Sequence, residues 1–151
     1  MVRRKPKLGK IYRVMKPKLC AAGITLRNQV DSAFPDRDRR SDGWIGDSSH
    51  AARKSDHNPT AEGWVRAIDI DADISDDRKA SYVFADQLRL LARRDKRLAY
   101  IIYSGRIASR RSLWRWKPYN GVNPHVHHIH CSFSKKGDTD GREFQIPILQ
   151  G

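Results

Sequence analysis

The segment of residues 126–133 constrains the fold more than any other part of the sequence. It is rich in β-branched and aromatic residues, which favours a strand, and the Asn-Pro pair just before it indicates a turn. Four of the six histidines of the chain fall between positions 125 and 130. Because side chains alternate along a strand, His128 and His130 are expected on one face and His127 on the other.

Two imidazoles on one strand face can bind the same metal ion, or one can bind the metal while the other carries a proton. His125 lies where the turn enters the strand. The tract leaves a second interpretation open, which is a His-rich surface strand or a cluster of histidines held by hydrogen bonds alone, because a short His tract is only a compositional signal. Ligands from elsewhere in the chain are needed to decide between the two.

A second polar stretch supplies candidates for those ligands. His57 lies in a loop, and residues 65–71 after it alternate weakly and contain Val and Ile, which favours a strand. Asp69 lies within this strand, and Asp71 shares its face. A loop histidine, a strand carboxylate and a histidine of residues 126–133 form a three-ligand set with one open position, which is typical of catalytic rather than structural zinc.

Length and charge predict one domain with a basic extension. The chain has 151 residues, and its four Trp, five Tyr and four Phe argue against disorder. The net charge is +13, and residues 1–18 hold eight Lys/Arg and no acidic residue. We interpret residues 1–18 as a basic N-terminal arm and residues 19–151 as a single domain. Such an arm suits nucleic acid, a membrane surface or an anionic cell-wall polymer, or it is a solvated tail.

Neither a membrane span nor a secretory signal is predicted. No apolar run reaches transmembrane length, and the basic start is not followed by a hydrophobic segment. Cys20 and Cys131 are too few for a disulfide framework, so we expect two buried thiols, consistent with synthesis in a reducing cytosol. The absence of a CxxC pair argues against a structural cysteine site for zinc.

Two helices are predicted from apolar periodicity. The first lies within residues 19–35, with Thr25 as its capping residue. The second starts after Ser75, whose hydroxyl is expected to cap it, and acidic residues follow in its first turn. Its apolar face comprises Ala80, Phe84, Leu88 and Leu91. Both helices are interpreted as packing elements without a chemical role.

Three further segments are predicted from local pattern. Residues 98–103 read as a buried strand that pairs with residues 106–108 through a tight turn at Ser104-Gly105. The polar segment 36–63 is long for a structureless loop in a compact domain, and we interpret it as the rim of the site because it leads into the candidate ligands. The apolar residues near the end of the chain, within 144–149, are expected to dock on the body of the domain.

Residues 109–122 interleave basic and aromatic side chains. Trp114, Trp116 and Tyr119 could stack on nucleic-acid bases, line a groove for a glycan-linked peptide, or simply cover the sheet. We treat these three aromatic residues as candidates for substrate binding.

Two motifs occur in order along the chain. The first is Ser55-x-His57, then Gly63, then Ala67-Ile68-Asp69, and the second is His125-x-x-His128-x-His130. Together they resemble the zinc D-Ala-D-Ala carboxypeptidase and endolysin peptidase family of the hedgehog/DD-peptidase fold. The resemblance is closest to the peptidase domains of actinobacterial phage lysins, in which runs like residues 41–47 and 52–59 are familiar. It covers roughly residues 25–134.

The resemblance implies an α+β fold in which helices flank a small antiparallel sheet, with a single zinc peptidase domain over residues 19–151. It implies a zinc ion bound by His57, Asp69 and His130. Asp69 is preferred to Asp71 because Ala-x-Asp is the order found in the family.

The resemblance also assigns roles to two further histidines. His128 would neighbour the metal as a hydrogen-bonding or proton-transfer group, and His125 matches the histidine that some members use as general base. The chain departs from the family pattern in two places. Residues 60–64 look like an insertion between the first two ligands, and His127 stands where other members have a carboxylate.

The implied reaction is hydrolysis of an amide bond in the stem peptide or cross-link of peptidoglycan, either an L-Ala-D-Glu or a D-Ala-linked bond, by a zinc-bound water. A histidine suits the proton transfer because its pKa lies near neutrality. Arg53 is the candidate for stabilising the oxyanion, with Arg106 as a second choice. Ser55 and Asp56 would bind substrate or orient His57 through its second ring nitrogen.

We expect a monomer that is made in the host cytoplasm without a signal peptide and acts on the cell wall after release, with the basic arm available for an anionic wall polymer. Two alternatives stay open. One is a zinc-retaining module that binds cell wall or protein without turnover. The other is an HNH-type nuclease, suggested by Asp56-His57-Asn58-Pro59 and by the charge, but residues 72–100 lack the Asn and His that would close that motif.

Overall fold

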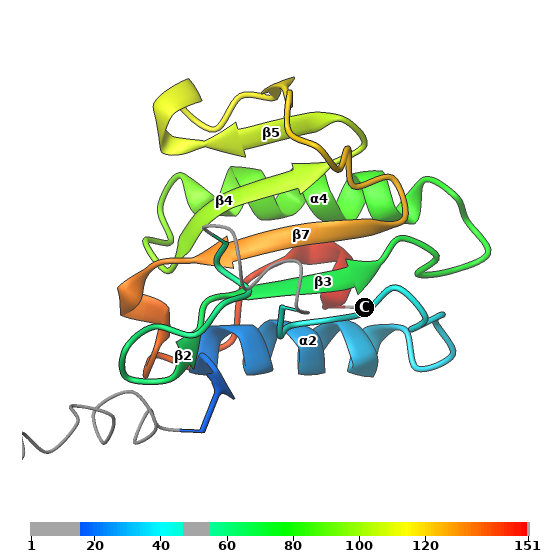
Figure 1. Cartoon of the computed structure of the whole chain (residues 1–151). Coiled ribbons are helices and arrows are strands. Elements are labelled where there is room, and N and C mark those ends of the chain that lie inside the picture. Colours follow the sequence, from blue (N-terminus) through cyan, green and yellow to red (C-terminus); the bar gives the residue numbers. More distant parts are fainter. Residues whose placement is uncertain (1–15, 47–54, 151) are drawn as a thin grey trace, which may run out of the picture.

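The structure, a computed structural model, describes residues 16–46 and 55–150. Its main feature is a five-stranded antiparallel sheet with the strand order β3-β7-β4-β5-β6 (Figure 1). These strands are β3 (Ala67–Asp71), β4 (Leu98–Tyr103), β5 (Arg106–Ser109), β6 (Lys117–Pro118) and β7 (His128–Phe133). The last strand in the sequence, β7, therefore lies between β3 and β4.

Two helices pack on this sheet. Helix α2 (Ala21–Ala33) runs beside β3, and helix α4 (Ala80–Ala92) lies behind β4 (Figure 1). The side chains that the three neighbouring strands turn toward the helices are apolar and buried, and they include Ile68, Ile70, Ile101, Ile129 and Cys131. The fold is thus α+β with a small antiparallel sheet and two helices, as predicted.

Strand β7 alternates as its sequence predicts. Its residues on the helix side are Ile129, Cys131 and Phe133, all in the hydrophobic core. His128 and His130 lie on the opposite side of the strand. The strand begins at His128 rather than Val126, and one more hydrogen bond, from the Ala72 N–H to the His127 carbonyl, lies just beyond the end of the β3–β7 ladder.

The predicted strand over residues 65–71 is two strands. β2 (Trp64–Val65) pairs in parallel with β1 (Lys18–Leu19), and β3 belongs to the main sheet. The interruption falls at Arg66, which donates two hydrogen bonds to the Asp138 carboxylate, at 2.8 and 2.7 Å. The chain changes sheets at this residue.

The basic arm lies mostly outside the described residues, since positions 1–15 are not among them. Lys18 belongs to β1, and its ammonium lies 4.2 Å from the centroid of the Trp64 ring. Strand β1 therefore includes the last residue of the stretch that the sequence assigns to the arm.

Helix α2 begins before its predicted cap. Its first residue is Ala21, whose N–H donates to the Asp138 carbonyl at 3.0 Å, so a neighbouring segment satisfies the helix start. Thr25 lies inside the helix, and its hydroxyl donates to the Gly141 carbonyl at 2.7 Å. The prediction of Thr25 as a cap is wrong, because the Asp138 carbonyl, rather than a capping side chain, accepts a hydrogen bond at the start of the helix.

Helix α4 begins later than predicted, at Ala80. The Ser75 hydroxyl accepts the N–H of Asp77 at 3.2 Å, and the Asp77 carboxylate accepts the N–H of Lys79 at 2.9 Å. These contacts form successive local turns, which compete with helical hydrogen bonding. The predicted apolar face is confirmed, since Ala80, Phe84, Leu88 and Leu91 are all buried.

The predicted hairpin is also confirmed. β4 and β5 pair with the register Tyr103 to Arg106, joined by Ser104 and Gly105. Both turn residues have positive φ, 51° and 74°, as a two-residue hairpin turn with the twist of its strands requires.

The C-terminal segment docks on the domain as predicted. Phe144 and Ile146 are fully buried. Gln29 of α2 donates to the Phe144 carbonyl at 2.9 Å and accepts the Phe144 N–H at 2.8 Å. Gln87 of α4 accepts the N–H of Ile148 at 2.8 Å. The segment therefore ties the two helices together.

Both cysteines are free and buried, as predicted. Burial raises the pKa of the Cys20 thiol to about 11, so it carries no charge at neutral pH. In the part of the chain that the structure describes, no helix combines the length and the apolar character needed to cross a bilayer.

We predict that Phe144→Ala lowers the free energy of unfolding by about 3–5 kcal/mol, because it leaves a cavity between the two helices. Urea titration followed by circular dichroism measures this. Val122→Ala is the control, since Val122 is 91% exposed and its truncation should change stability by less than about 0.5 kcal/mol. A loss below about 1 kcal/mol for Phe144→Ala would show that the segment does not stabilise the core.

Candidate metal centre

The pairing of β3 with β7 places Asp69 directly opposite His130. Opposed side chains in an antiparallel pair have Cβ atoms about 4.5–5.5 Å apart, so the carboxylate and the imidazole meet on the face away from the helices. Asp69 Oδ1 lies 3.0 Å from His130 Nδ1. Tyr100 of β4 stacks on the His130 ring with a centroid distance of 5.5 Å, which holds the ring from the other side.

A loop brings His57 to the same point. Gly43 forms an antiparallel bridge with Asp69, so the segment before residue 47 runs along the edge of β3. The next residue, Trp44, accepts a hydrogen bond from His57 Nδ1 at its carbonyl, at 2.9 Å. The predicted rim segment therefore positions His57 with its backbone, in the part of that segment that the structure describes.

The ligand atoms of His57, Asp69 and His130 lie close together, and we call these three residues the ligand triangle. Asp69 Oδ1 lies 3.0 Å from His130 Nδ1, Asp69 Oδ2 lies 3.2 Å from His57 Nε2, and His57 Nε2 lies 3.2 Å from His130 Nδ1. Zinc–ligand bonds of about 2.0–2.1 Å in a tetrahedron separate the ligand atoms by about 3.3–3.4 Å. The three predicted ligands therefore form a mostly buried group that fits a metal ion.

Hydrogen-bond chemistry also favours a cation here. The Trp44 carbonyl can only accept, so Nδ1 of His57 carries the hydrogen and a neutral ring leaves a lone pair on Nε2. That lone pair faces the Asp69 carboxylate and His130 Nδ1. A neutral His130 can donate its Nδ1 hydrogen to the carboxylate while the Ser132 hydroxyl donates to its Nε2, but the lone pair of His57 Nε2 then faces a negative carboxylate. A metal ion would bind all three groups at once.

The charges of these groups agree with this interpretation. Burial alone would raise the pKa of Asp69, but hydrogen bonds to His130 and His57 hold it well below its usual range. Burial alone would lower the pKa of His57, but the hydrogen bond and charge of Asp69 raise it. Asp69 is thus a carboxylate at neutral pH, in the state that binds metal.

The position of His130 depends on two contacts that the sequence reasoning missed. Ser132 Oγ lies 2.7 Å from His130 Nε2, leaving Nδ1 for the cluster. The stacked Tyr100 donates its hydroxyl to Asp56 Oδ2 at 2.7 Å, which joins the loop to the sheet. Alternation along β7 could have indicated Ser132, two residues after His130 on the same face, but no local signal marks Tyr100.

Asp71, the other acidic residue on this strand face, has a structural role. Its carboxylate accepts the N–H groups of Ser41 at 2.9 Å and Asp73 at 2.8 Å. Its own N–H donates to Asp42 Oδ1 at 2.8 Å. Asp71 therefore fixes the loop beside β3, and the preference for Asp69 as the candidate ligand agrees with the geometry.

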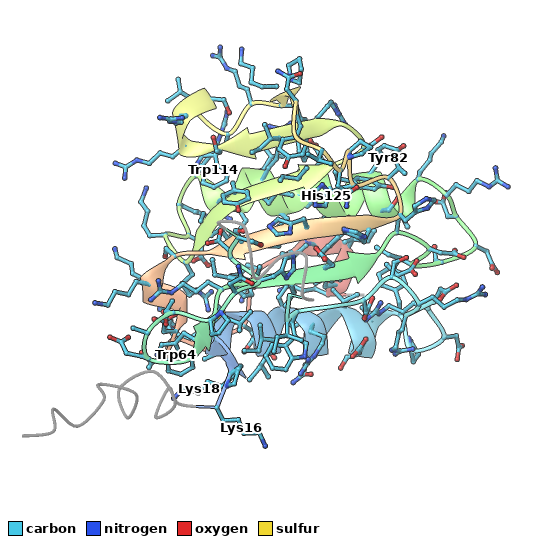
Figure 2. The ribbon with its side chains drawn as sticks, viewed as in Figure 1. Lys16, Lys18, Trp64, Tyr82, Trp114 and His125 are labelled. Atoms are coloured by element: carbon cyan, nitrogen blue, oxygen red, sulfur yellow. The ribbon has the colours of Figure 1, made fainter. Side chains whose placement is uncertain are left out.

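His128 and His125 lie beside the triangle. His128 Nε2 is 3.6 Å from Asp69 Oδ1, and the His128 ring packs edge-on to His125 with a centroid distance of 5.0 Å. His125 also contacts the ring of His130 at 5.3 Å. Figure 2 shows His125 over the middle of the sheet, on the side turned away from α4. The structure thus brings both predicted proton-transfer residues to the site.

Both of these histidines are neutral at neutral pH. Burial, together with the neighbouring His130 and His128, lowers the pKa of His125 to about 4. Burial also lowers the pKa of His128, against the opposing charge of Asp69. Neutral imidazoles can accept a proton or bind a metal.

The remaining candidates before β3 lie in different places. Ser55 Oγ accepts the N–H of His57 at 3.2 Å, so it supports the local turn. Asp56 accepts from Tyr100, and the second ring nitrogen of His57 contacts a backbone carbonyl, as described above. Arg53, the candidate for the oxyanion, lies outside the described residues.

The aromatic candidates divide between the two sides of the sheet. Tyr119 packs edge-on to His125 with a centroid distance of 5.7 Å. Trp114 is buried in the hydrophobic core, and Trp116 donates from its indole nitrogen to Asp86 of α4 at 3.1 Å. The structure therefore brings Tyr119 to the site, whereas the two tryptophans cover the helix side. The alternation of Trp114 and Trp116 with basic residues in the sequence did not indicate that the two tryptophans face the helices.

A scan against protein-family models and searches of curated proteins and of solved structures return no match to this chain. The interpretation of the site therefore rests on its geometry and on the motifs in the sequence.

We predict that Asp69→Asn abolishes stoichiometric zinc binding, because the amide removes the negative charge between the two imidazoles. Atomic emission after gel filtration measures the bound metal. Asp71→Asn, two residues along the same strand, should keep the metal, since its contacts hold the loop. If Asp69→Asn retained one zinc per chain, the ligand set would be wrong.

We predict that Ser132→Ala raises the dissociation constant for zinc about tenfold, because groups that orient a metal-binding histidine contribute about 10–100-fold to affinity. Competition with a chromophoric chelator measures the constant. Ser81→Ala is the matched control, since Ser81 is also buried but bonds Tyr103 on the helix side. Equal zinc affinities for the two variants would show that Ser132 does not orient His130 for metal binding.

Proposed function

We propose that this chain is a zinc-dependent peptidoglycan peptidase of the endolysin type, which hydrolyses an amide bond of the stem peptide or cross-link. The observation that carries the proposal is the convergence of His57, Asp69 and His130, with His125 and His128 beside them. The motifs that resemble the zinc carboxypeptidase and endolysin peptidase family contribute these same five residues.

The ligand set supports a catalytic rather than a structural metal. Three protein ligands with nitrogen and oxygen donors leave a coordination position for water or substrate. The side chain of Asp69 keeps 17% of its surface exposed, so the cluster reaches solvent on one side. Zinc bound there would supply a Lewis acid that activates water and polarises the scissile carbonyl.

The neighbouring histidines supply the proton transfer in this proposal. His128 and His125 are neutral at neutral pH, so either can take a proton from the attacking water and give it to the leaving amine. His125 is in edge contact with Tyr119, the candidate substrate-binding residue, and this contact supports a position for His125 on the substrate side of the cluster. We assign His125 as the general base and His128 as the group that hydrogen-bonds beside the metal.

The oxyanion requires a further cation or hydrogen-bond donor. Arg106, the second choice from the sequence, lies with its guanidinium 4.8 Å from the centroid of the Trp116 ring, on the helix side of the sheet. Arg53 therefore stays the candidate for this role. Peptide substrate would contact Tyr119, and the basic residues 1–18 would contact an anionic wall polymer once the protein is released from the host cell.

We predict that the zinc-loaded protein cleaves purified muropeptides, and that His125→Ala and His128→Ala each lower turnover by about 10²-fold or more. Mass spectrometry of the fragments measures cleavage and identifies the bond. Both variants should keep the first equivalent of zinc, since neither residue belongs to the ligand triangle. Removing zinc with a chelator should stop cleavage, and adding it back should restore it.

His127→Ala is the control for this experiment, because His127 is exposed and belongs to the same histidine tract. If both variants kept wild-type turnover, the proton-transfer assignment would be wrong. If the wild-type protein bound zinc and left every muropeptide intact, the chain would be a non-catalytic binding module. A parallel plasmid-nicking assay identifies the nuclease alternative.

A further inference from the structure

Asp69 belongs to two groups of possible metal ligands. The first is the triangle with His57 and His130. In the second, Asp69, His125 and His128 each offer one atom, and these atoms lie within 4.8 Å of one another. Proton transfer needs only one base beside the metal. It therefore does not explain why the ligand atoms of Asp69, His125 and His128 also converge.

The two oxygens of Asp69 point in different directions. Oδ2 lies 3.2 Å from His57 Nε2, whereas Oδ1 lies between the two groups, 3.0 Å from His130 Nδ1 and 3.6 Å from His128 Nε2. A carboxylate whose two oxygens face different ligands can bridge two metal ions, and bridged ions in hydrolytic enzymes lie about 3.5–4 Å apart. The geometry of Asp69 thus suits two neighbouring ions as well as one.

His125 is held in place for such a role. Its backbone has a φ of 57°, which is uncommon for a residue other than glycine. Asn123 Oδ1 accepts its N–H at 2.9 Å, and its carbonyl accepts the N–H of Ser104 at 2.9 Å, which ties the turn to the β4–β5 hairpin. Its Nδ1 is buried and has no hydrogen-bond partner in the described part of the chain. A buried polar atom without a partner is costly, and a bound cation would satisfy it.

We propose that the chain binds a second zinc ion through Asp69, His125 and His128, next to the first ion and more weakly. The second site is weaker because His125 and His128 are more exposed than His57 and His130, and because two neighbouring cations repel. A further part of this proposal rests on the proposed function: the second ion binds the two histidines that would transfer the proton. Excess zinc therefore inhibits hydrolysis.

Equilibrium dialysis against increasing free zinc, followed by atomic emission, tests the site without reference to activity. The wild-type protein should bind one ion and then, at a free concentration at least about tenfold higher, a second ion. His125→Gln and His128→Gln should each stop at one ion. His127→Gln is the matched control and should still bind two, because the exposed His127 belongs to neither group. Circular dichroism checks that all variants are folded.

A wild-type protein that binds one ion at every concentration would overturn the second site. So would a double variant, His125→Gln with His128→Gln, that still binds two ions, because the second ion would then lie elsewhere. Muropeptide cleavage is measured separately. If the protein bound two ions but cleaved no muropeptide, the proposed function would be refuted and the second site retained. If it cleaved muropeptides, bound only one ion and was not inhibited by zinc, the second site would be refuted and the proposed function retained.

Discussion

The opposition of Asp69 and His130 across the β3–β7 ladder is the constraint on which the site depends. A shift of one residue in this register would turn one ligand toward the helices. The register is fixed on the other face, where Ile68, Ile70 and Ile129 are buried in the core. Hydrophobic burial on one side of the sheet thus determines ligand geometry on the other, and the loop that carries His57 has only to dock on an edge already in place.

Sequence periodicity predicts the parts of this structure that obey a repeat. Alternation along residues 128–133 gives the face of the histidines, and the alternation around Asp69 gives its face. The apolar face of α4 and the hairpin at Ser104-Gly105 follow in the same way. Polar residues on one face of two strands lie together when those strands pair. The sequence pattern and the motifs together therefore predict the candidate ligands.

Contacts between distant segments could not be predicted, because they leave no local pattern. The carbonyl of Trp44 orients His57, yet any residue type could supply that carbonyl. Helix α2 starts on a backbone contact from Asp138 rather than on a capping side chain. The bond between Trp116 and Asp86 turns an aromatic residue of a basic stretch toward a helix. Each outcome depends on tertiary packing, which overrides local propensity.

The position of β7 in the sheet has a consequence for how the chain acquires its structure. This strand is the last one in the sequence, yet it separates β3 from β4. While residues 128–133 are still inside the ribosome, neither of those strands has its main partner. The sheet therefore closes through pairings far apart in sequence, which are slow to form, and the ligand triangle cannot assemble before residues 128–133 have emerged from the ribosome.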